Sequence, residues 1–555
     1  IEDFPDESSR ADRLRVQLNE LVGQKILDEL KRRRTSAQHA LFRSSIAKYP
    51  VDQLSNSLRR QVRELLAADR DALARLARAK QRLGNLLTTV SPDDLRQDLR
   101  PLVDEITTGL DIESLDRLVA FLQFADDTSL AATERIALAG SGWLIGSANA
   151  TRDAAEALRL RKARDGLLDA LRADDADRPQ IVAELESLEG IGPRRIAQLI
   201  SLLPPIRSTR AAKPGIPLRI APTTGDALGY WVILPPEYNP HHRYPALVAL
   251  HSSGGTPAKA LRWWNGTEEK PRVARQRGYI MIAPELPGVQ PVGAQADSPA
   301  QLQIGPALHR AVWRALVDAR KRFRIDSDRT FLVGHGQGAT AAFEIGMSHP
   351  GWFAGVVPIV GSLNSYCTRY WRNAQKLPWY IVNGELDQPR TEGNASGLNR
   401  MLRYRFPMIY CEYAGRGYEF FNEEAPAIVD WMERTRRNDD PREFETVTLR
   451  PSDNTFHWVD MHELTLPDTN GTRKRPLRLK AKITVGNTIH VNAPTRHTTI
   501  WLSPATIDFE RRVQFRINGR SRRNLFLTPK IGDMIADFHR RGDREKLYWV
   551  RLDFN

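Results

Sequence analysis

Hydrophobic residues in the first part of the chain recur at the spacing of α-helices. Up to about residue 205, apolar side chains are separated by three or four positions, as at Leu14, Leu18 and Leu21 and again at Leu73 and Leu76. This spacing places them on one face of a helix, where they can pack against a neighbouring helix. The pattern predicts an N-terminal all-α domain over residues 1–210, built from about six to nine helices.

The pattern changes after Leu203-Pro204-Pro205, because these prolines and Lys213-Pro214-Gly215 interrupt helices. From here to about residue 437, short apolar runs alternate with helical segments. The runs lie at 245–251, 279–283, 330–333, 356–360, 379–382 and 408–411, and helices are expected at 306–323, 338–348, 395–404 and 424–436. Continuous apolar strands that alternate with helices are typical of a covered parallel sheet. Residues 211–440 are therefore predicted to form a mostly parallel, doubly wound α/β domain.

After Arg437 the chain shows alternating strands without helical segments between them. These strands are expected at 446–450, 480–485, 488–491, 499–502, 513–517 and 548–552. The pair Gly486-Asn487 between two of them is typical of a tight hairpin turn. We predict a small all-β, sandwich-like domain over residues 441–555.

Composition is that of a globular protein with several domains. The chain has 555 residues, more than one hydrophobic core usually supports, and is 41% hydrophobic and 27% charged. It contains no apolar run near the roughly 18 residues of a membrane-spanning helix, so no transmembrane segment is expected. The first residue is Ile1 and not methionine, so an export signal could have been removed. Only Cys367 and Cys411 are present, which excludes a disulfide framework and leaves a single bridge open.

The chain is strongly basic, with a formal net charge of +14 and an isoelectric point near 9.8. This balance favours acidic partners such as nucleic acid or another acidic polymer. Basic residues gather in 473–482 and at Arg511, Arg512, Arg516, Arg520, Arg522 and Arg523. They could form a polyanion-binding face, or they could be charges on edge strands that discourage aggregation, which is the interpretation we favour.

The segment Gly190-Ile191-Gly192 followed by Arg194-Arg195 resembles a helix-hairpin-helix module, in which backbone N–H groups face a DNA phosphate. Ile196 stands where that module usually has a small residue, and no second copy is present. The segment 190–197 is therefore interpreted as a corner between two helices. Nucleic acid is the less favoured partner, although it stays open.

Residues Phe331 to Gly338 read as a strand that runs into a tight glycine turn, Gly334-His-Gly336-Gln-Gly338. A turn of this kind presents a nucleophilic serine in the Gly-x-Ser-x-Gly elbow, but here the central position is Gly336. Three other segments accompany it: the loop 251–255 (His-Ser-Ser-Gly-Gly), Asp387 after a strand, and 413–420 with Tyr418 after the last strand.

Together with the phrases 326–334 and 349–355, these segments resemble the esterase and prolyl-oligopeptidase-like branch of the α/β-hydrolase superfamily, over roughly residues 215–437. The resemblance implies an α/β-hydrolase fold and a site in which a serine attacks, a histidine takes its proton and an aspartate orients the histidine. The matching positions are Gly336, Tyr418 and Asp387. Glycine carries no nucleophile, and a phenol with an ordinary pKa near 10 is a poor base beside imidazole near 6.5. The combination of domains is similar to large bacterial hydrolase-like proteins that are often predicted to be exported, which implies an exported or periplasmic location.

An oxyanion-hole-like pocket is expected to persist, because its donors are backbone N–H groups. They would come from Gln337 and from the loop around Ser252 and Ser253. Such a pocket could bind a carboxylate or carbonyl group. The alternative is that Tyr418 fills the space and donates a hydrogen bond to Asp387.

These observations predict a catalytically inactive pseudoenzyme of the α/β-hydrolase superfamily that acts as a binding, structural or assembly module, through a protein partner or self-assembly. One alternative is a serine-hydrolase-type esterase or peptidase that uses an unrecognised nucleophile or has been inactivated by mutation. Another is a polyanion-binding or nucleic-acid-binding protein. No cofactor is expected, and no histidines or carboxylates have the spacing of metal ligands.

Overall fold

The computed structural model describes residues 5–555 except 50, 208, 210–211, 222–227, 268–269, 271, 288–301, 439 and 466–474. The predicted boundary at residues 210 and 211, and Arg473 and Lys474 of the basic stretch, lie outside the described residues, as do the side chains of Arg522 and Arg523. The chain divides into two compact units, one of residues 1–161, 235–242 and 275–278, the other of 162–234, 243–274 and 279–555. Among the described helices, none is both long and apolar enough to cross a membrane.

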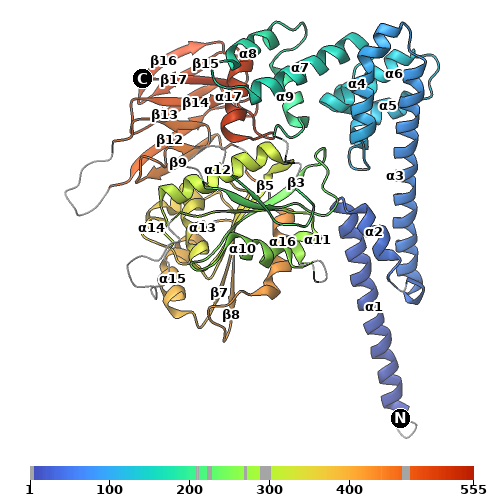
Figure 1. The fold of residues 1–555 in the computed structure, drawn as a ribbon. Coiled ribbons are helices and arrows are strands. Elements are labelled where there is room, and N and C mark those ends of the chain that lie inside the picture. The colour runs from blue at the N-terminus through green and yellow to red at the C-terminus, as the bar shows by residue number, and fades with distance from the viewer. Residues whose placement is uncertain are drawn as a thin grey trace. The chain divides into compact units, whose positions relative to one another are not determined.

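Helices build the first unit, drawn in blue to cyan in Figure 1. They are α1 (Pro5–Thr35), α2 (His39–Ile46), α3 (Asn56–Thr88), α4 (Asp93–Gly109), α5 (Val119–Phe124) and α6 (Ala132–Ile145), with short 3-10 turns η1 (Val51–Gln53), η2 (Leu115–Leu118) and η3 (Ser147–Asn149). Helix α3 packs against α4 and α6. Only part of the apolar face of α1 is packed against other residues. Leu27 and Leu30 are buried, whereas Leu14 and Leu18 are exposed.

A helical segment leads into the second unit and includes α7 (Ala154–Arg172), α8 (Arg178–Glu186) and α9 (Pro193–Leu202). The glycine pair of the predicted helix corner lies between α8 and α9. Gly190 has a φ of +75°, and Gly192 precedes Pro193, which begins α9. Both helices pack against α17 (Ile531–Arg541) near the end of the chain.

An eight-stranded sheet with the order β1-β2-β4-β3-β5-β6-β7-β8 forms the centre of the second unit. The strands are β1 (Leu218–Ile220), β2 (Tyr230–Ile233), β3 (Tyr244–Leu250), β4 (Ile280–Pro284), β5 (Ile325–His335), β6 (Gly355–Ile359), β7 (Trp379–Gly384) and β8 (Met408–Tyr413). Strands β3 to β8 pair in parallel, while β2 runs antiparallel to β1 and β4. The register places Leu250 opposite Gly334, so the ends of β3 and β5 lie side by side.

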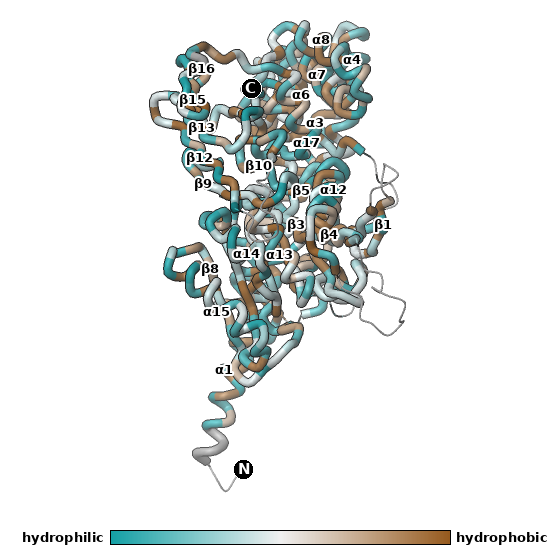
Figure 2. The backbone as a smooth tube through the Cα atoms, turned by 90° about the vertical axis from the view of Figure 1, so that its left-hand side faces the viewer, coloured by the Kyte–Doolittle hydropathy of each residue, from teal (hydrophilic) through white to brown (hydrophobic). Residues whose placement is uncertain are grey.

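Strands β3 and β4 are apolar along their length (Figure 2), whereas β5 is apolar only in its second half, around residues 331–333. Every residue of β3, β4, β6 and β7 is buried, because helices cover the sheet. These helices are α10 (Pro257–Asn265), α11 (Val273–Gln276), α12 (Pro306–Arg322), α13 (Gln337–Ser348), α14 (Cys367–Tyr370), α15 (Gln388–Arg403) and α16 (Ala425–Arg434), with η4 (Trp371–Ala374) and η5 (Asn422–Glu424). The predicted helices are confirmed, but α15 begins seven residues before the expected 395, because Pro389 is suited to a first helical turn. Both cysteines are free.

The last part of the chain forms two sheets, β10-β11-β14-β17 and β16-β15-β13-β12-β9. Their strands are β9 (Glu443–Thr448), β10 (Thr455–Phe456), β11 (Val459–Met461), β12 (Leu477–Ile483), β13 (Thr488–Asn492), β14 (Thr498–Leu502), β15 (Val513–Ile517), β16 (Arg520–Leu525) and β17 (Val550–Phe554). Strands β12 and β13 pair antiparallel across the turn at Gly486-Asn487, which confirms the predicted hairpin. Residues of both sheets share one hydrophobic core, for example Ile500 and Phe515.

The prediction that no helix interrupts these strands is wrong, because α17 lies between β16 and β17. Its buried residues Ile531, Met534, Ile535 and Phe538 follow the helical three- and four-residue spacing. The sequence therefore carried the signal, and it was overlooked among the neighbouring strands.

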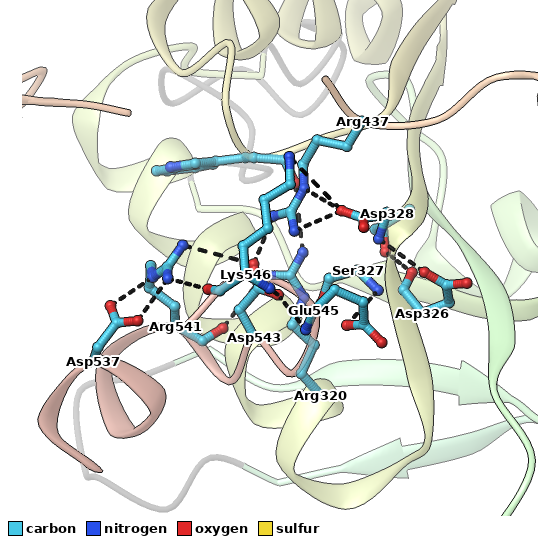
Figure 3. Close-up of polar contacts among 12 residues, drawn as sticks. Arg320, Asp326, Ser327, Asp328, Arg437, Asp537, Arg541, Asp543, Glu545 and Lys546 are labelled. Atoms are coloured by element: carbon cyan, nitrogen blue, oxygen red, sulfur yellow. Dashed lines mark hydrogen bonds and ion pairs between the residues drawn. The ribbon is translucent and has the colours of Figure 1, made fainter. Parts of the chain in front are cut away.

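A buried ionic network ties the end of the chain to the α/β domain (Figure 3). Nη1 of Arg437 lies 2.7 Å from the carboxylate of Asp543, and Nη2 of Arg437 lies 2.9 Å from Asp328. Arg541 pairs with Asp537 at 2.6 Å and lies 3.7 Å from Asp543. Burial alone would raise the pKa of Asp543, but the charges of Arg437 and Arg541 hold it below its ordinary value. Asp543 is therefore held as a buried carboxylate among arginines.

Candidate functional site

The four segments singled out in the sequence all follow strands of the parallel part of the sheet. The loop 251–255 follows β3, the glycine turn follows β5, Asp387 follows β7 and Tyr418 follows β8. Because parallel strands end at the same edge, these segments meet there, at the usual position of a ligand site in such sheets. Backbone bonds connect the last two, since Leu386 N–H donates to the Arg416 carbonyl at 2.8 Å and Glu385 N–H donates to the Tyr413 carbonyl at 3.0 Å.

Gly336 has the backbone conformation of a sharp strand-to-helix elbow. Its φ is +59° and its ψ is −120°, a left-handed region that favours glycine. The Gly336 N–H donates to the Ile359 carbonyl at 3.0 Å, and the Gly336 carbonyl accepts from Ala339 and Thr340 at the start of α13. Gly338 is required for a different reason, since a Cβ there would collide with the Leu250 carbonyl at the end of β3.

The phenol of Tyr418 lies over Gly336. A Cβ built on Gly336 would meet the Tyr418 Oη well inside 3.0 Å, the distance below which real Cβ atoms are essentially not found, and would lie 3.5 Å from the Cβ of Ser252. The Tyr418 hydroxyl therefore occupies the space that a side chain at position 336 would take. The Tyr418 side chain is 48% exposed, and within the described part of the chain its hydroxyl has no hydrogen-bond partner.

Asp387 is paired with an arginine and not with Tyr418, so the expected hydrogen bond between Tyr418 and Asp387 is wrong. Nη1 of Arg390 donates to Oδ1 of Asp387 at 2.7 Å, and the Arg390 guanidinium carbon lies 4.7 Å from the centre of the Tyr418 ring. Oδ2 of Asp387 is buried without a hydrogen-bond partner among the described residues. Arg390 was missed because α15 was expected to begin after it, although a helix starting at Gln388 brings residue 390 next to 387.

His335, beside the elbow, is held by aromatic neighbours. Its ring stacks on Phe420 at 4.0 Å between centres and meets Tyr418 edge-on at 5.1 Å, while Nε2 lies 3.0 Å from the Glu419 carbonyl. Burial lowers the pKa of His335, which favours the neutral ring. These contacts assign His335 to packing beneath the loop of Tyr418.

The oxyanion-hole-like residues lie on either side of the elbow. Gln337 is the first residue of α13, so its backbone N–H has no acceptor inside the helix, and its side-chain oxygen accepts from Leu302 N–H at 2.9 Å. The Ser252 carbonyl accepts from Gly255 N–H at 2.9 Å, which closes a tight turn. Oγ of Ser253 is buried and lacks a hydrogen-bond partner among the described residues.

A cavity of about 350 Å³ opens beside the elbow. Its apolar and aromatic lining residues are Ala249, Leu250, Ala260, Trp263, Trp264, Val333, Ile359 and Phe420. Its basic lining residues are Lys259, Arg262 and Arg272. Trp264 is buried in the domain core, whereas Trp263 is only partly buried. The cavity walls thus combine an apolar surface with positive charge.

Comparisons with known proteins match part of this chain. It is 28% identical over 142 residues to dipeptidyl-peptidase 5 of Porphyromonas gingivalis, a match that covers 26% of this chain and 20% of that protein. It is 29% identical over 147 residues to NocK of Nocardia uniformis subsp. tsuyamanensis, named as an esterase, with 26% of this chain and 41% of that protein covered. The chain thus spans less than half the length of these curated relatives. No family model matches it.

Solved structures that are similar to part of this chain include hydrolases. A thermostable esterase is 19% identical with a TM-score of 0.31, over 40% of this chain and 63% of that chain. An S-formylglutathione hydrolase from Agrobacterium tumefaciens is 15% identical with a TM-score of 0.32, over 40% of this chain and 95% of that chain.

The strand order and the elbow after β5 describe the central domain, and the curated matches of this chain are to a peptidase and an esterase. A shared fold does not establish a shared activity, because the chemistry of a site depends on its own residues. In strand order, elbow and curated matches, the central domain of this chain is therefore similar to the esterase- and peptidase-like branch of the α/β-hydrolase superfamily.

Proposed function

We propose that the α/β-hydrolase domain is catalytically inactive and serves as a ligand-binding module. In this proposal Gly336, Asp387 and Tyr418 occupy the positions of the nucleophile, the acid and the base. The observation that carries the proposal is the Tyr418 hydroxyl, which fills the space of a side chain on Gly336. A substrate carbonyl would have to enter that same space to be attacked.

Three residues, and not only the two seen in the sequence, depart from what a serine hydrolase needs at its catalytic site. Gly336 offers no nucleophile, and Tyr418 cannot act as an imidazole base. Arg390 adds a third departure, because it pairs with Oδ1 of Asp387 and places its positive charge against the Tyr418 ring, at the position of the base. Members of a triad act as a unit, so any one of these changes forfeits most of the rate.

The nearby serines do not replace the missing nucleophile. Ser253 has no base within hydrogen-bonding distance in the described part of the chain. The neighbouring His251 directs its Nδ1 to the Ser252 carbonyl at 3.0 Å, and burial lowers its pKa. Neither serine is therefore arranged for attack.

The cavity beside the elbow supports binding of a small apolar ligand with an anionic group. Its volume of about 350 Å³ is in the range of small-molecule sites. Lys259 and Arg262 are exposed at this cavity and form no ion pair with a described residue, so they are free to meet a carboxylate. Trp263 offers a flat apolar surface beside them.

Inactivity is tested with a fluorophosphonate probe and p-nitrophenyl acetate and butyrate on the full chain. We expect no labelling and no turnover above the heat-denatured protein. Labelling of Ser252, Ser253 or another serine, located by peptide mapping, would overturn the proposal of inactivity.

Ligand binding is tested separately by calorimetry with 1-naphthoate, an aromatic carboxylate, and with uncharged naphthalene-1-methanol. We expect the carboxylate to bind at least about tenfold more tightly, with Trp263→Ala and the pair Lys259→Ala and Arg262→Ala each reducing its affinity. Arg403→Ala, an exposed change on α15, is the matched control. Equal binding by all variants would place the ligand elsewhere.

A further inference from the structure

A buried group of histidine and carboxylate side chains lies away from the elbow, where α12, the end of α13 and the segment after β9 meet. Nδ1 of His309 lies 3.1 Å from Nε2 of His349, and Nε2 of His349 lies 3.9 Å from Oδ1 of Asp453. One possible ligand atom from each of His309, His349 and Asp453 lies within 4.8 Å of the other two, and all three side chains are buried. Residues 309, 349 and 453 are far apart in the chain and share no local spacing, so only the fold brings them together.

Neighbouring side chains determine which atoms of His309 and Asp453 face His349. Oδ2 of Asp453 accepts hydrogen bonds from Nε of Arg450 at 2.8 Å and from the Tyr370 hydroxyl at 2.9 Å, which leaves Oδ1 facing His349. Nε2 of His309 lies 3.4 Å from Oε1 of Glu344, so Nδ1 faces His349. A carboxylate behind an imidazole is the outer support usually found around metal-binding histidines.

The charges of the group are not balanced by the protein. Glu344 and Asp453 are two buried carboxylates, and Arg450, which pairs with both, is one buried cation. With both histidines neutral, this leaves the buried group with a formal charge of −1, which a bound cation would offset.

We propose that His309, His349 and Asp453 bind a divalent transition-metal ion of the zinc type. Two imidazole nitrogens and one carboxylate oxygen are ligands that zinc prefers, at about 2.0–2.2 Å from the ion. In a tetrahedral site such bonds separate neighbouring ligand atoms by about 3.4 Å, and the two separations in the structure, 3.1 and 3.9 Å, lie on either side of that value. A water molecule would complete the set of four ligands. The ion would join α12 and α13 of the hydrolase domain to the β9–β10 segment.

A cavity reaches His349, but arginine side chains line it as well. A cavity of about 170 Å³ is lined by His349 together with Trp313 and Trp352. Arg320, Arg437, Arg540 and Arg541 also line this cavity, and their charges oppose the entry of a cation. The metal is therefore best supplied while the protein is synthesised and folds.

The test uses the full chain, produced with added Zn²⁺ or Co²⁺ and dialysed against metal-free buffer. Elemental analysis should give about one ion per chain, and X-ray absorption of the zinc form should show imidazole nitrogens at about 2.0 Å. His309→Gln and His349→Gln should each reduce the bound metal at least about tenfold. His457→Gln, a partly buried histidine outside the group, is the matched control and should retain the ion.

Bound metal below about a tenth of an ion per chain in both preparations would overturn the proposal. So would unchanged metal content in the two glutamine variants. If those variants fail to fold, the absorption spectrum of the native zinc form decides, because a metal shell without imidazole scattering contradicts the site.

Discussion

Nη1 of Arg390 donates a hydrogen bond to Oδ1 of Asp387 at 2.7 Å, while its guanidinium lies over the Tyr418 ring. One side chain thus holds both the buried carboxylate and the phenol that covers Gly336. Because Oδ2 of Asp387 is buried without a partner, Arg390 supplies the charge that makes this carboxylate tolerable.

Replacement of Arg390 by alanine should destabilise the protein by about 1–3 kcal/mol, because it leaves Asp387 buried without its cation. Adding Asp387→Asn should recover at least about 1 kcal/mol, since the uncompensated charge is then removed. Urea unfolding followed by tryptophan fluorescence measures both. Arg403→Ala on the same helix is the control, and an equal effect of the two arginine changes would contradict the role given to Arg390.

Gly336→Ala should cost about 1–3 kcal/mol, because the new Cβ meets the Tyr418 hydroxyl and the backbone has a positive φ. In a Tyr418→Ala background the collision disappears and only the backbone strain remains, so the cost should be smaller. A double-mutant cycle from urea unfolding gives the difference.

Gly393→Ala is the matched control for this cycle, since a Cβ at that position of α15 meets open space. It should be neutral or stabilising by up to about 1 kcal/mol. If Gly336→Ala costs the same with and without Tyr418, the phenol does not occupy the space above the elbow.

The arrangement of the α/β domain was predictable because its signals are local. Continuous apolar runs bounded by turns marked β3 to β8, and the turn 334–338 required glycines that no other element explains. The pairing of Tyr418 with Gly336 could be suspected for the same reason, since each residue follows a strand of known order. The sequence left open whether the space above Gly336 is an empty pocket or is filled by Tyr418, and the structure places the Tyr418 hydroxyl there.

Contacts between residues distant in sequence escaped prediction. The pairing of Arg390 with Asp387 depends on where α15 begins, and a helix boundary is uncertain by a few residues from sequence alone. The group of His309, His349 and Asp453 depends on packing of the hydrolase domain against the C-terminal sheets. No periodic pattern reports such packing.

Low pH should reduce the free energy of unfolding, because it protonates the buried carboxylate of Asp543. Its pKa is lowered in the folded state from an ordinary 3.8, so its contribution to stability is present above about pH 4 and is lost as the pH falls below that value. Asp543→Asn should cost about 3–5 kcal/mol at pH 7, because Arg437 and Arg541 lose a buried partner. Between pH 5 and 3 the unfolding free energy of this variant should fall less steeply than that of the unchanged protein.

Urea unfolding at stepped pH measures this difference, and Glu392→Gln, an exposed carboxyl on α15, is the control. An acid dependence that is the same in Asp543→Asn and in the unchanged chain would show that other carboxyl groups determine it.

Restoring a reactive serine should require three changes. Gly336→Ser with Tyr418→His supplies a nucleophile and a base, but Arg390 still pairs with Oδ1 of Asp387 and places its positive charge beside the new imidazole. Adding Arg390→Ala frees that oxygen, so the triple variant should react with a fluorophosphonate at least about tenfold faster than the double variant. A second triple variant with Gly336→Ala in place of Gly336→Ser lacks the hydroxyl and should stay unlabelled. If the serine-containing triple variant is folded and yet reacts no faster than the double variant, Arg390 is not the third obstacle, and the departures from a working site extend beyond Gly336, Tyr418 and Arg390.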